Sequence, residues 1–521
     1  YTTNRVGNEV STDLNSINET AGDRRIYLEA MVDYNRTFGR HDVNAMLLYN
    51  QDELVNNVPG NNLINSLPKR KQGLAGRLSY AYDGKYMAEV NMGYNGSENF
   101  AKGHRWGFFP SIALGYNISE ESFFEPLRKV ITSMKLRGSW GLVGNDQIGG
   151  ERFIYMPTIN LSGKGFTTGI DQNYGLSGPV YTRYENNSIT WEVGEKINLG
   201  IDLQLLNSLN IVVDIFRETR RDIFQKKGTI PTYLGTGNTD VFGNLAEMKN
   251  QGLDLSIDYN KAFSKDFYMN FKGTFTYAHN EITKYDEAPK YAFQSKVGQS
   301  ANVSQGYLSN GLFLDEAEID RYNQQMGSTL GAGDIKYLNV SNMHGYGDDI
   351  VDVDDWTWIG NPTVPEIVYG FGPSFKYKNW DFSFFFQGVA KTSLFMSGFH
   401  PFGDNSLRNV LQFVANDRWS PTNQNVDAKY PRLTRKTSLN NTNPGNSGRT
   451  SDYWMRDGSF LKLKNMELGY TFKRMRFYIS GSNLLTFSKF DLWDPEQGGG
   501  SGLKYPTQRV FNVGFQMTFN N

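Results

Sequence analysis

The sequence contains no cysteine, which excludes disulfide bonds, thiol nucleophiles and cysteine-ligated zinc or iron–sulfur centres. It also lacks any run of about 18 consecutive apolar residues, so no transmembrane helix is predicted. Neither sign of charge dominates, because 53 basic and 54 acidic side chains give a formal net charge of -1. Without a basic field there is no electrostatic reason to expect nucleic-acid binding. The strands of a membrane β-barrel alternate apolar and polar residues and contain no long apolar run, so a membrane location stays open.

Aromatic residues and glycine are abundant. The 521 residues include 35 Phe, 30 Tyr and 54 Gly but only 17 Pro. This composition favours many β-strands joined by glycine-containing turns. At roughly 100–200 residues per domain, the length would predict roughly three or four domains. The aromatic content instead indicates one large all-β body that contains the whole chain.

A two-residue period marks the strands. Apolar side chains occupy every second position from 197 to 205, and polar residues such as Asn198 and Asp202 fill the positions between them. This period is typical of a strand with one apolar and one polar face, and a helix cannot use it. After a polar turn at 207–208 the alternation resumes at Leu209, as expected for a hairpin.

The same unit recurs along the chain, and about fifteen antiparallel strands are predicted. The predicted hairpins pair residues 25–36 with 41–51, 74–82 with 86–94, 108–117 with 134–141, 197–205 with 209–216, 251–260 with 267–277, 368–377 with 380–390, and 460–472 with 475–483; a last strand covers 509–519.

The connections between these strands are unequal. Those inside the hairpins are mostly about two to five residues, whereas those between hairpins are long and cover residues 95–107, 142–195, 217–250, 278–367, 391–459 and 484–508. An outer-membrane barrel has short periplasmic turns and long extracellular loops, with an apolar face toward lipid and a polar face toward a water-filled lumen. A soluble β-sandwich or propeller is the alternative, but it predicts shorter strands and similar loops on both sides. We therefore expect an all-β, transmembrane antiparallel β-barrel.

The predicted strand number bears on how the barrel closes. In hydrocarbon an unpaired sheet edge leaves N–H and C=O groups without partners, so a spanning sheet must close on itself. A single-chain barrel with both ends on the periplasmic side closes with an even number of antiparallel strands. About fifteen strands therefore predict that residues 1–521 form the C-terminal portion of one outer-membrane β-barrel domain, with N-terminal strands absent.

Several segments resemble the SusC/RagA family of TonB-linked outer-membrane transporters, and they arrive in the family's order. They are residues 105–116 (RWGFFPSIALGY), 118–124 (ISEESFF), 136–145 (LRGSWGLVGN), 191–202 (WEVGEKINLGID), 333–337 (GDIKY) and 359–362 (IGNP).

The resemblance implies a barrel of the TonB-dependent transporter type in the outer membrane of a Gram-negative cell, with about 22 strands and a plugged lumen. Of these, about 15 are expected here, so the barrel is N-terminally truncated and the plug domain is absent. The family also implies import of nutrients, as glycans (oligosaccharides) or peptides, with a SusD-like lipoprotein as partner. TonB itself would be contacted through the missing N-terminal region.

Other functions are weighed beside this one. A siderophore or cofactor receptor is an alternative within transport, and a non-transporting structural or adhesive outer-membrane barrel is an alternative outside it. An enzyme has no positive support, because the sequence shows no nucleophile elbow, phosphate-binding loop or metalloprotease motif.

An acidic loop is the candidate metal site. Asp348, Asp349, Asp352, Asp354 and Asp355 fall within a short stretch, and calcium takes six to eight oxygen ligands. The first four are the candidate calcium ligands, with a solvated acidic loop as the alternative. The EF-hand spacing is missing. The resembled family often carries an acidic Asp-x-Asn-Gly-Asp-Gly loop here, and this sequence departs from it.

Trp356 and Trp358 follow the acidic loop directly. Exposed indole rings could stack on sugar faces, so both are candidate substrate-binding residues. The alternative is that they belong to the aromatic girdle at the membrane interface or pack within the loop.

Overall fold

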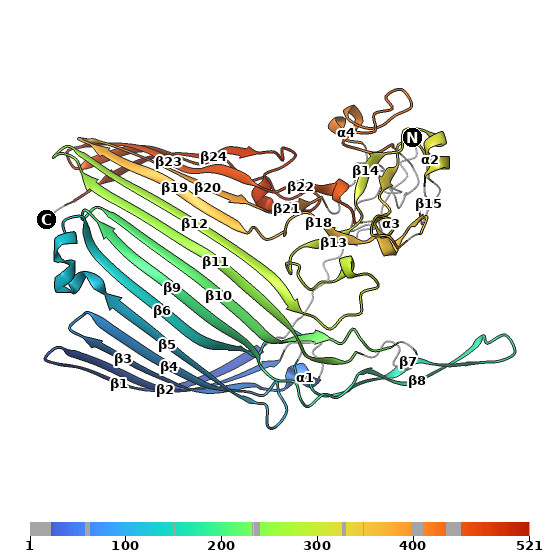
Figure 1. Cartoon of the computed structure of the whole chain (residues 1–521), viewed down its shortest axis with the longest axis horizontal. Coiled ribbons are helices and arrows are strands. Elements are labelled where there is room, and N and C mark those ends of the chain that lie inside the picture. The colour runs from blue at the N-terminus through green and yellow to red at the C-terminus, as the bar shows by residue number, and fades with distance from the viewer. Residues whose placement is uncertain are drawn as a thin grey trace, which may run out of the picture.

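The computed structural model describes residues 22–57, 63–150, 152–231, 233, 240–322, 324–325, 330–346, 348–396, 410–433 and 450–519. One antiparallel sheet of 15 strands dominates it. In Figure 1 this sheet is a curved wall that runs from β1 at the bottom to β23 and β24 at the top. The expected large antiparallel sheet of a barrel is therefore confirmed.

The strands of the sheet follow chain order, and each pairs with the next in the series. They are β1 (Gly22–Phe38), β2 (His41–Asn57), β3 (Lys69–Tyr82), β4 (Tyr86–Ser97), β5 (Trp106–Asn117), β6 (Ile131–Asn145), β9 (Glu192–Leu205), β10 (Leu209–Lys226), β11 (Phe242–Ala262), β12 (Phe267–Lys284), β19 (Ile367–Tyr377), β20 (Trp380–Ala390), β23 (Phe460–Phe472), β24 (Met475–Ser488) and β25 (Val510–Met517). Each predicted strand is present, in the predicted order.

The smaller elements lie in the connections. They are α1 (Leu63–Ser66), η1 (Ile118–Glu120), η2 (Ser122–Leu127), β7 (Thr158–Thr168), β8 (Tyr174–Arg183), η4 (Ala292–Gln294), β13 (Ser304–Gly306), β14 (Ser309–Leu312), α2 (Glu316–Arg321), β15 (Gln324–Gln325), β16 (Ile335–Tyr337), α3 (Val340–Met343), β17 (Ile350–Val351), η5 (Val353–Asp355), β18 (Thr357–Ile359), β21 (Ser393–Phe395), α4 (Gln412–Asn416), η6 (Asp452–Trp454), β22 (Met455–Asp457) and η7 (Pro495–Gln497). No helix in the described part of the chain is long and apolar enough to cross a membrane.

Tight turns join the strands at one end of the sheet. Between β3 and β4, Asp83 and Gly84 have φ values of 55° and 66°. Positive φ at both central residues is the signature of the two-residue turns that match the twist of a hairpin, and Asp-Gly suits them. Such turns keep this end of the β3–β4 hairpin compact. Apart from the connection between β5 and β6, which contains η1 and η2 at the tight-turn end, the long connections leave the opposite end, which we call the long-loop end.

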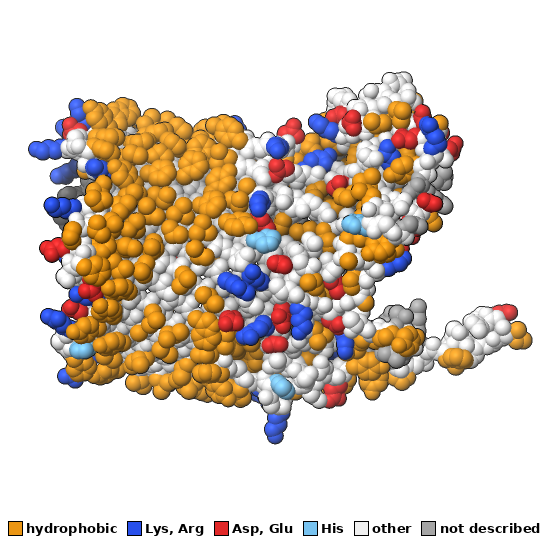
Figure 2. Space-filling model, in the orientation of Figure 1, with side chains coloured by type: hydrophobic (Ala, Val, Ile, Leu, Met, Phe, Trp, Pro, Cys, Tyr) orange, Lys and Arg blue, Asp and Glu red, His pale blue; other side chains and the backbone are white. Residues whose placement is uncertain are grey.

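The outer face of the sheet is apolar. Leu199, Ile215, Leu253 and Tyr277 lie directly opposite one another on four adjacent strands, and Leu199 and Ile215 are 63% and 61% exposed. Figure 2 shows apolar side chains covering this face as a broad belt. Burying a large apolar side chain is worth about 1.5–3 kcal/mol, so a belt of this size calls for a hydrocarbon surrounding rather than water.

The belt ends at the same level on neighbouring strands. One outward position beyond the apolar row, toward the long-loop end, Arg217, Gln251 and His279 lie opposite one another. In Figure 2 charged side chains gather along this border of the belt. The change from apolar to polar residues at a common level is the pattern that the edge of a bilayer imposes on a barrel.

The long loops fold into structures of their own. The described residues of three of them, within 285–366, 391–459 and 489–509, share one hydrophobic core and form a lobe, which we call the loop lobe (upper right in Figure 1). Its buried residues are Tyr307, Leu312, Ile335, Tyr337, Val351, Leu394, Met396, Val414, Trp419, Ala428, Tyr430, Trp454 and Phe490. A smaller core, formed by Phe100, Ile148, Ile154, Ile189 and Trp191, ties the loops after β4 and β6 together.

Candidate functional site

The inner face of the sheet carries ion pairs. Arg137 on β6 reaches Asp202 on β9, with Nε 3.0 Å from Oδ1, and Asp214 on β10, with Nη2 2.6 Å from Oδ2. On other strands Arg77 pairs with Glu89 at 2.7 Å. Charges at this depth are costly toward lipid and tolerated toward a water-filled lumen. The inner face is therefore the wet face of the barrel.

A shallow cavity follows this inner wall. It has a volume of about 450 Å³, and Arg77, Glu89, Lys135 and Arg137 are among the residues that line it. On the last strands of the series, Arg476 of β24 bridges Asp381 of β20 and Glu467 of β23, with its Nη2 2.5 Å from Glu467 Oε1. The wall thus offers paired charges and hydrogen-bonding groups to a solute.

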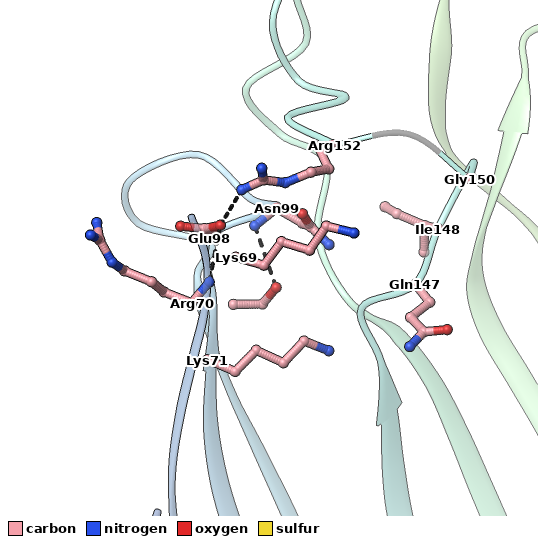
Figure 3. Close-up of a pocket in the computed structure, with 10 residues that line it drawn as sticks. Lys69, Arg70, Lys71, Glu98, Asn99, Gln147, Ile148, Gly150 and Arg152 are labelled. Atoms are coloured by element: carbon pink, nitrogen blue, oxygen red, sulfur yellow. Dashed lines mark hydrogen bonds and ion pairs between the residues drawn. The ribbon is translucent and has the colours of Figure 1, made fainter. Parts of the chain in front are cut away.

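A second cavity opens where the strands reach the long-loop end, and we call it the mouth pocket. It measures about 430 Å³ and lies between the start of β3, the end of β4 and the segment after β6 (Figure 3). The residues that line it are Lys69, Arg70, Lys71, Ser97, Glu98, Asn99, Gln147, Ile148, Gly150 and Arg152.

Arg152 holds one wall of the mouth pocket in place. Its guanidinium is nearly buried, and it donates to the carbonyl oxygens of Ile64, Leu67 and Pro68 at 2.9, 2.6 and 2.8 Å. It also forms an ion pair with Glu98. These contacts use the fork of donors that makes arginine suited to fixed, desolvated positions, so Arg152 shapes the pocket and is not free for a ligand.

Lys71 and Asp146 form the second fixed pair at the mouth pocket. Lys71 Nζ lies 2.8 Å from Asp146 Oδ2, and Ser97 Oγ donates to the same carboxylate at 2.8 Å. Asn99 Nδ2 donates to the Asp146 carbonyl oxygen at 3.1 Å. The Asp146 side chain is 10% exposed and that of Lys71 is 50% exposed. Of this pair, Lys71 is therefore the residue that lines the cavity.

The predicted acidic site lies in the loop lobe, where its carboxylates fold the loop. Asp355 is fully buried and accepts the N–H groups of Ser341 at 2.9 Å and Asp352 at 2.7 Å. Asp352 accepts the Asp354 N–H at 2.8 Å and so caps the short helix η5.

The remaining carboxylates of the acidic loop point to other partners. Asp348 Oδ1 accepts the Ile350 N–H at 3.2 Å, Asp354 pairs with Lys290, and Asp349 is exposed. Over the described residues, no three His, Asp or Glu side chains are grouped so as to hold a metal ion. Calcium binding by Asp348, Asp349, Asp352 and Asp354 stays a prediction, which a calcium titration of the folded protein tests.

The two tryptophans after the acidic loop have different settings. Trp358 lies in β18, which pairs with β13, and its Nε1 donates to the Ser295 carbonyl oxygen at 2.9 Å. Trp356 is 37% exposed, with its ring 6.0 Å from the buried ring of Tyr307 in an edge-on contact. Trp358 therefore packs within the loop, and Trp356 is partly exposed to solvent. Substrate contact by either residue stays a prediction.

Sequence reasoning missed two features of this region. One is the mouth pocket. The other is a cluster of rings in the loop lobe, in which the centroids of Tyr291 and Tyr346 are 4.2 Å apart and those of Phe293 and His344 are 4.7 Å apart. At the mouth pocket the end of the β3–β4 hairpin meets the segment after β6, and in the ring cluster residues 291–293 meet residues 344–346. No spacing rule for a strand or helix relates the segments that meet.

A buried lysine anchors another loop over the barrel. Lys462 at the start of β23 is fully buried, and its Nζ lies 2.5 Å from Asp494 Oδ2 and 2.7 Å from Glu496 Oε2. Burial alone would raise the pKa of the Asp494 carboxyl, but hydrogen bonds from Lys462 and from the Glu496 backbone hold that pKa below its ordinary value. The pKa of Glu496 is lowered as well, because Lys462 and Lys464 together outweigh its burial.

The polar inner wall, the apolar belt and the long loops are the features of an outer-membrane β-barrel. The family described as TonB dependent receptor-like, beta-barrel, matches residues 1–484. The chain belongs to this family. TonB-dependent receptors of this barrel type are outer-membrane proteins, and the family is not one of enzymes.

Two curated TonB-dependent receptors illustrate the relationship. TonB-dependent receptor P3 of Formosa agariphila is 26% identical over 481 residues, which cover 85% of this chain and 45% of P3. TonB-dependent receptor SusC of Bacteroides thetaiotaomicron is 28% identical over 471 residues, which cover 85% of this chain and 43% of SusC. The chain thus spans about half the length of the curated relatives it matches.

Solved structures confirm the fold of this TonB-dependent receptor barrel. The structure of the RagAB peptide transporter superposes with a TM-score of 0.71 at 19% sequence identity, covering 96% of this chain and 56% of that one. The family match and the similarity to SusC, together with this shared fold, confirm the resemblance to SusC/RagA proteins. In an outer-membrane barrel the short turns are periplasmic and the long loops extracellular, which places the loop lobe and the mouth pocket on the outside of the cell.

Proposed function

We propose that this chain supplies the barrel wall and outer loops of a TonB-dependent importer of nutrients. The nutrients are oligosaccharides or peptides, a SusD-like lipoprotein is the partner at the outer surface, and TonB supplies the energy through a region outside the sequence described. A plug domain from that region would close the lumen. Residues 1–521 are then the C-terminal portion of one barrel domain.

The observation that carries the proposal is the separation of the two faces of the sheet. The row from Leu199 to Tyr277 faces outward, whereas Arg137, Asp202 and Asp214 form ion pairs on the inner face. A polar inner wall around a water-filled lumen is the arrangement of barrels that pass polar solutes. A polar solute needs a wet path lined by groups that replace its water contacts.

The substrate class is supported by chemistry and by relatives. The wall and the mouth pocket present amide, hydroxyl, carboxylate and ammonium groups, which suit oligosaccharides and peptides alike. RagAB, which shares the fold, is a peptide transporter. The resemblance to the SusC/RagA family implies both nutrient classes and the lipoprotein partner.

Uptake by intact cells tests the proposal. Cells that make the full-length protein are compared with a strain in which its gene is deleted, each with and without TonB, for uptake of labelled oligosaccharides and peptides of defined length. Importer function predicts that one class of nutrient is taken up only when both proteins are present. Loss of growth on ferric siderophores instead would support the siderophore alternative, and unchanged uptake of every solute would support a structural barrel.

A further inference from the structure

We propose that the mouth pocket binds a carboxylate group of the transported oligomer, with Lys69 as the residue that attracts it. This inference rests on the importer function proposed above and names a feature that its substrate carries. It follows from the charges in the pocket, from the direction of its lysines and from the groups that line the rest of its wall.

Among the charged residues that line the mouth pocket, one cation has no opposite charge beside it in the described part of the chain. Arg152 is paired with Glu98, and Lys71 is paired with Asp146 at 2.8 Å. Arg70 is paired with Glu53, with Nε 2.8 Å from Oε2. Lys69 forms no ion pair with any residue that the structure describes, and it is exposed. The described lining of the pocket therefore carries one uncompensated positive charge, that of Lys69.

The alternation of β3 decides which cations face the cavity. Figure 3 shows Lys69 and Lys71 extending into the space opposite Gln147, whereas Arg70 points to the other side of the strand. This direction matches the register, because Lys69 and Lys71 have the same parity as the inward-facing Arg77. A ligand in the pocket therefore meets two ammonium groups from one strand, of which only Lys71 is already neutralised.

The rest of the wall suits a small polar body. The Gln147 carboxamide is exposed, and Ile148 and the backbone of Gly150 close the side opposite the lysines. A volume of about 430 Å³ lies at the lower end of the range for small-molecule pockets, about 300–1,000 Å³. The pocket is thus sized for one unit of an oligomer that carries a carboxylate and hydrogen-bonding groups.

Lysine is a point charge and does not require the planar, two-pronged geometry that arginine prefers. The shared chemistry is therefore a carboxylate, whether it comes from an acidic sugar or from a peptide. Because the site is open to water, one additional ion pair is expected to change affinity by about three- to tenfold at low salt and by less at high salt.

Binding to the full-length protein with masked and unmasked probes tests the inference. The sugar probes are tetragalacturonate and its methyl ester, and the peptide probes are N-acetylated tetra-alanine and its C-terminal amide. Each is titrated at about 20 mM and about 300 mM salt against the wild type, Lys69→Gln and Lys69→Glu. Lys102→Gln is the matched control, since Lys102 is an exposed lysine in the neighbouring loop and does not line the pocket.

The expected result is that one carboxylate probe binds about three- to tenfold more tightly than its masked form, and that Lys69→Gln removes this advantage while Lys102→Gln keeps it. Lys69→Glu should reverse it. Which pair shows the effect identifies the source as sugar or peptide. Equal binding of masked and unmasked probes in both pairs overturns the inference, as does an advantage that survives in Lys69→Gln.

Failure of this inference can be told apart from failure of the importer function. If cells take up neutral oligosaccharides or peptides in a TonB-dependent way and Lys69→Gln leaves uptake of charged forms unchanged, transport stands and the carboxylate site falls. If no solute is taken up, the importer function itself is contradicted.

Discussion

The guanidinium of Arg137 on β6 reaches across the intervening strand β9 to the carboxylate of Asp214 on β10, with Nη2 and Oδ2 2.6 Å apart. Gly200 on β9 lies beneath this contact, and a Cβ atom there would be 2.7 Å from both Arg137 Cζ and Asp214 Oδ1. The ion pair spans three strands because the middle strand has no side chain at this position.

Gly200→Val should therefore break the pair. The valine side chain would displace the Arg137 guanidinium and leave Asp214, whose side chain is 16% exposed, without its partner. The expected loss is about 1–3 kcal/mol of the free energy of unfolding. Urea unfolding in detergent micelles measures it. Gly93→Ala on β4 is the control, because a Cβ atom there meets nothing closer than 3.4 Å; an equal loss in both variants would contradict the account.

An arginine should be tolerated on only one face of β11. Leu255 belongs to the outward set with Leu253, and Ser256 faces the lumen beside Asp254. Leu255→Arg is expected to cost about 2–4 kcal/mol if it lies near the bilayer midplane, whereas Ser256→Arg should cost little. The measurement is the folding free energy of each variant in lipid vesicles. Similar values for the two would argue against the assigned faces.

The anchor at Lys462 should depend on pH. Because the pKa values of Asp494 and Glu496 are lowered in the folded protein, their stabilising effect is present above their ordinary values of about 4 and is lost as the pH falls through the lowered values. A spin label on Ser501→Cys should thus be held at neutral pH and become mobile only in acid. In Lys462→Met the label should be mobile at neutral pH too, and a pH-independent spectrum in the wild type would count against the anchor.

Asp355 should be required for the turn that the acidic loop forms. Asp355→Ala leaves the N–H groups of Ser341 and Asp352 without their acceptor, at a cost of about 1–3 kcal/mol. Amide hydrogen exchange of residues 339–355 should accelerate. The exposed Asp349→Ala serves for comparison and should leave the exchange unchanged; if Asp355→Ala also leaves it unchanged, the carboxylate does not fold the loop.

The strands were predictable where the bilayer imposes a period of two, and less so beyond it. For β11 the alternation predicts residues 251–260, whereas the strand runs over Phe242–Ala262. Its first residues lie beyond the apolar belt, where both faces of the strand meet water or loops. Strands β10 and β11 stay paired as far as Lys226 and Phe242. Backbone hydrogen bonds hold this part of the pair, and they do not require alternating apolar and polar side chains.

The candidate site was harder to predict, for two physical reasons. Lys69 at the start of β3 and Arg152 in the loop after β6 line one pocket, and the side-chain periodicity of a strand does not predict which loop residues pack against its end. Asp352 and Asp355 are close in sequence, as a cation site would require, but a short helical turn directs both carboxylates to backbone N–H groups. Proximity in sequence indicated a cluster without indicating the direction in which its side chains point.

The account depends most on the claim that alternate residues of one strand face water and lipid, and the absence of cysteine makes a direct measurement possible. Single cysteines are placed at Asn198→Cys and Leu199→Cys on β9, and the protein in lipid vesicles is exposed to a water-soluble, membrane-impermeant maleimide. Rapid labelling at position 198 and protection at 199 is the predicted result. Equal labelling of the two positions, or protection at 198 with labelling at 199, would contradict it.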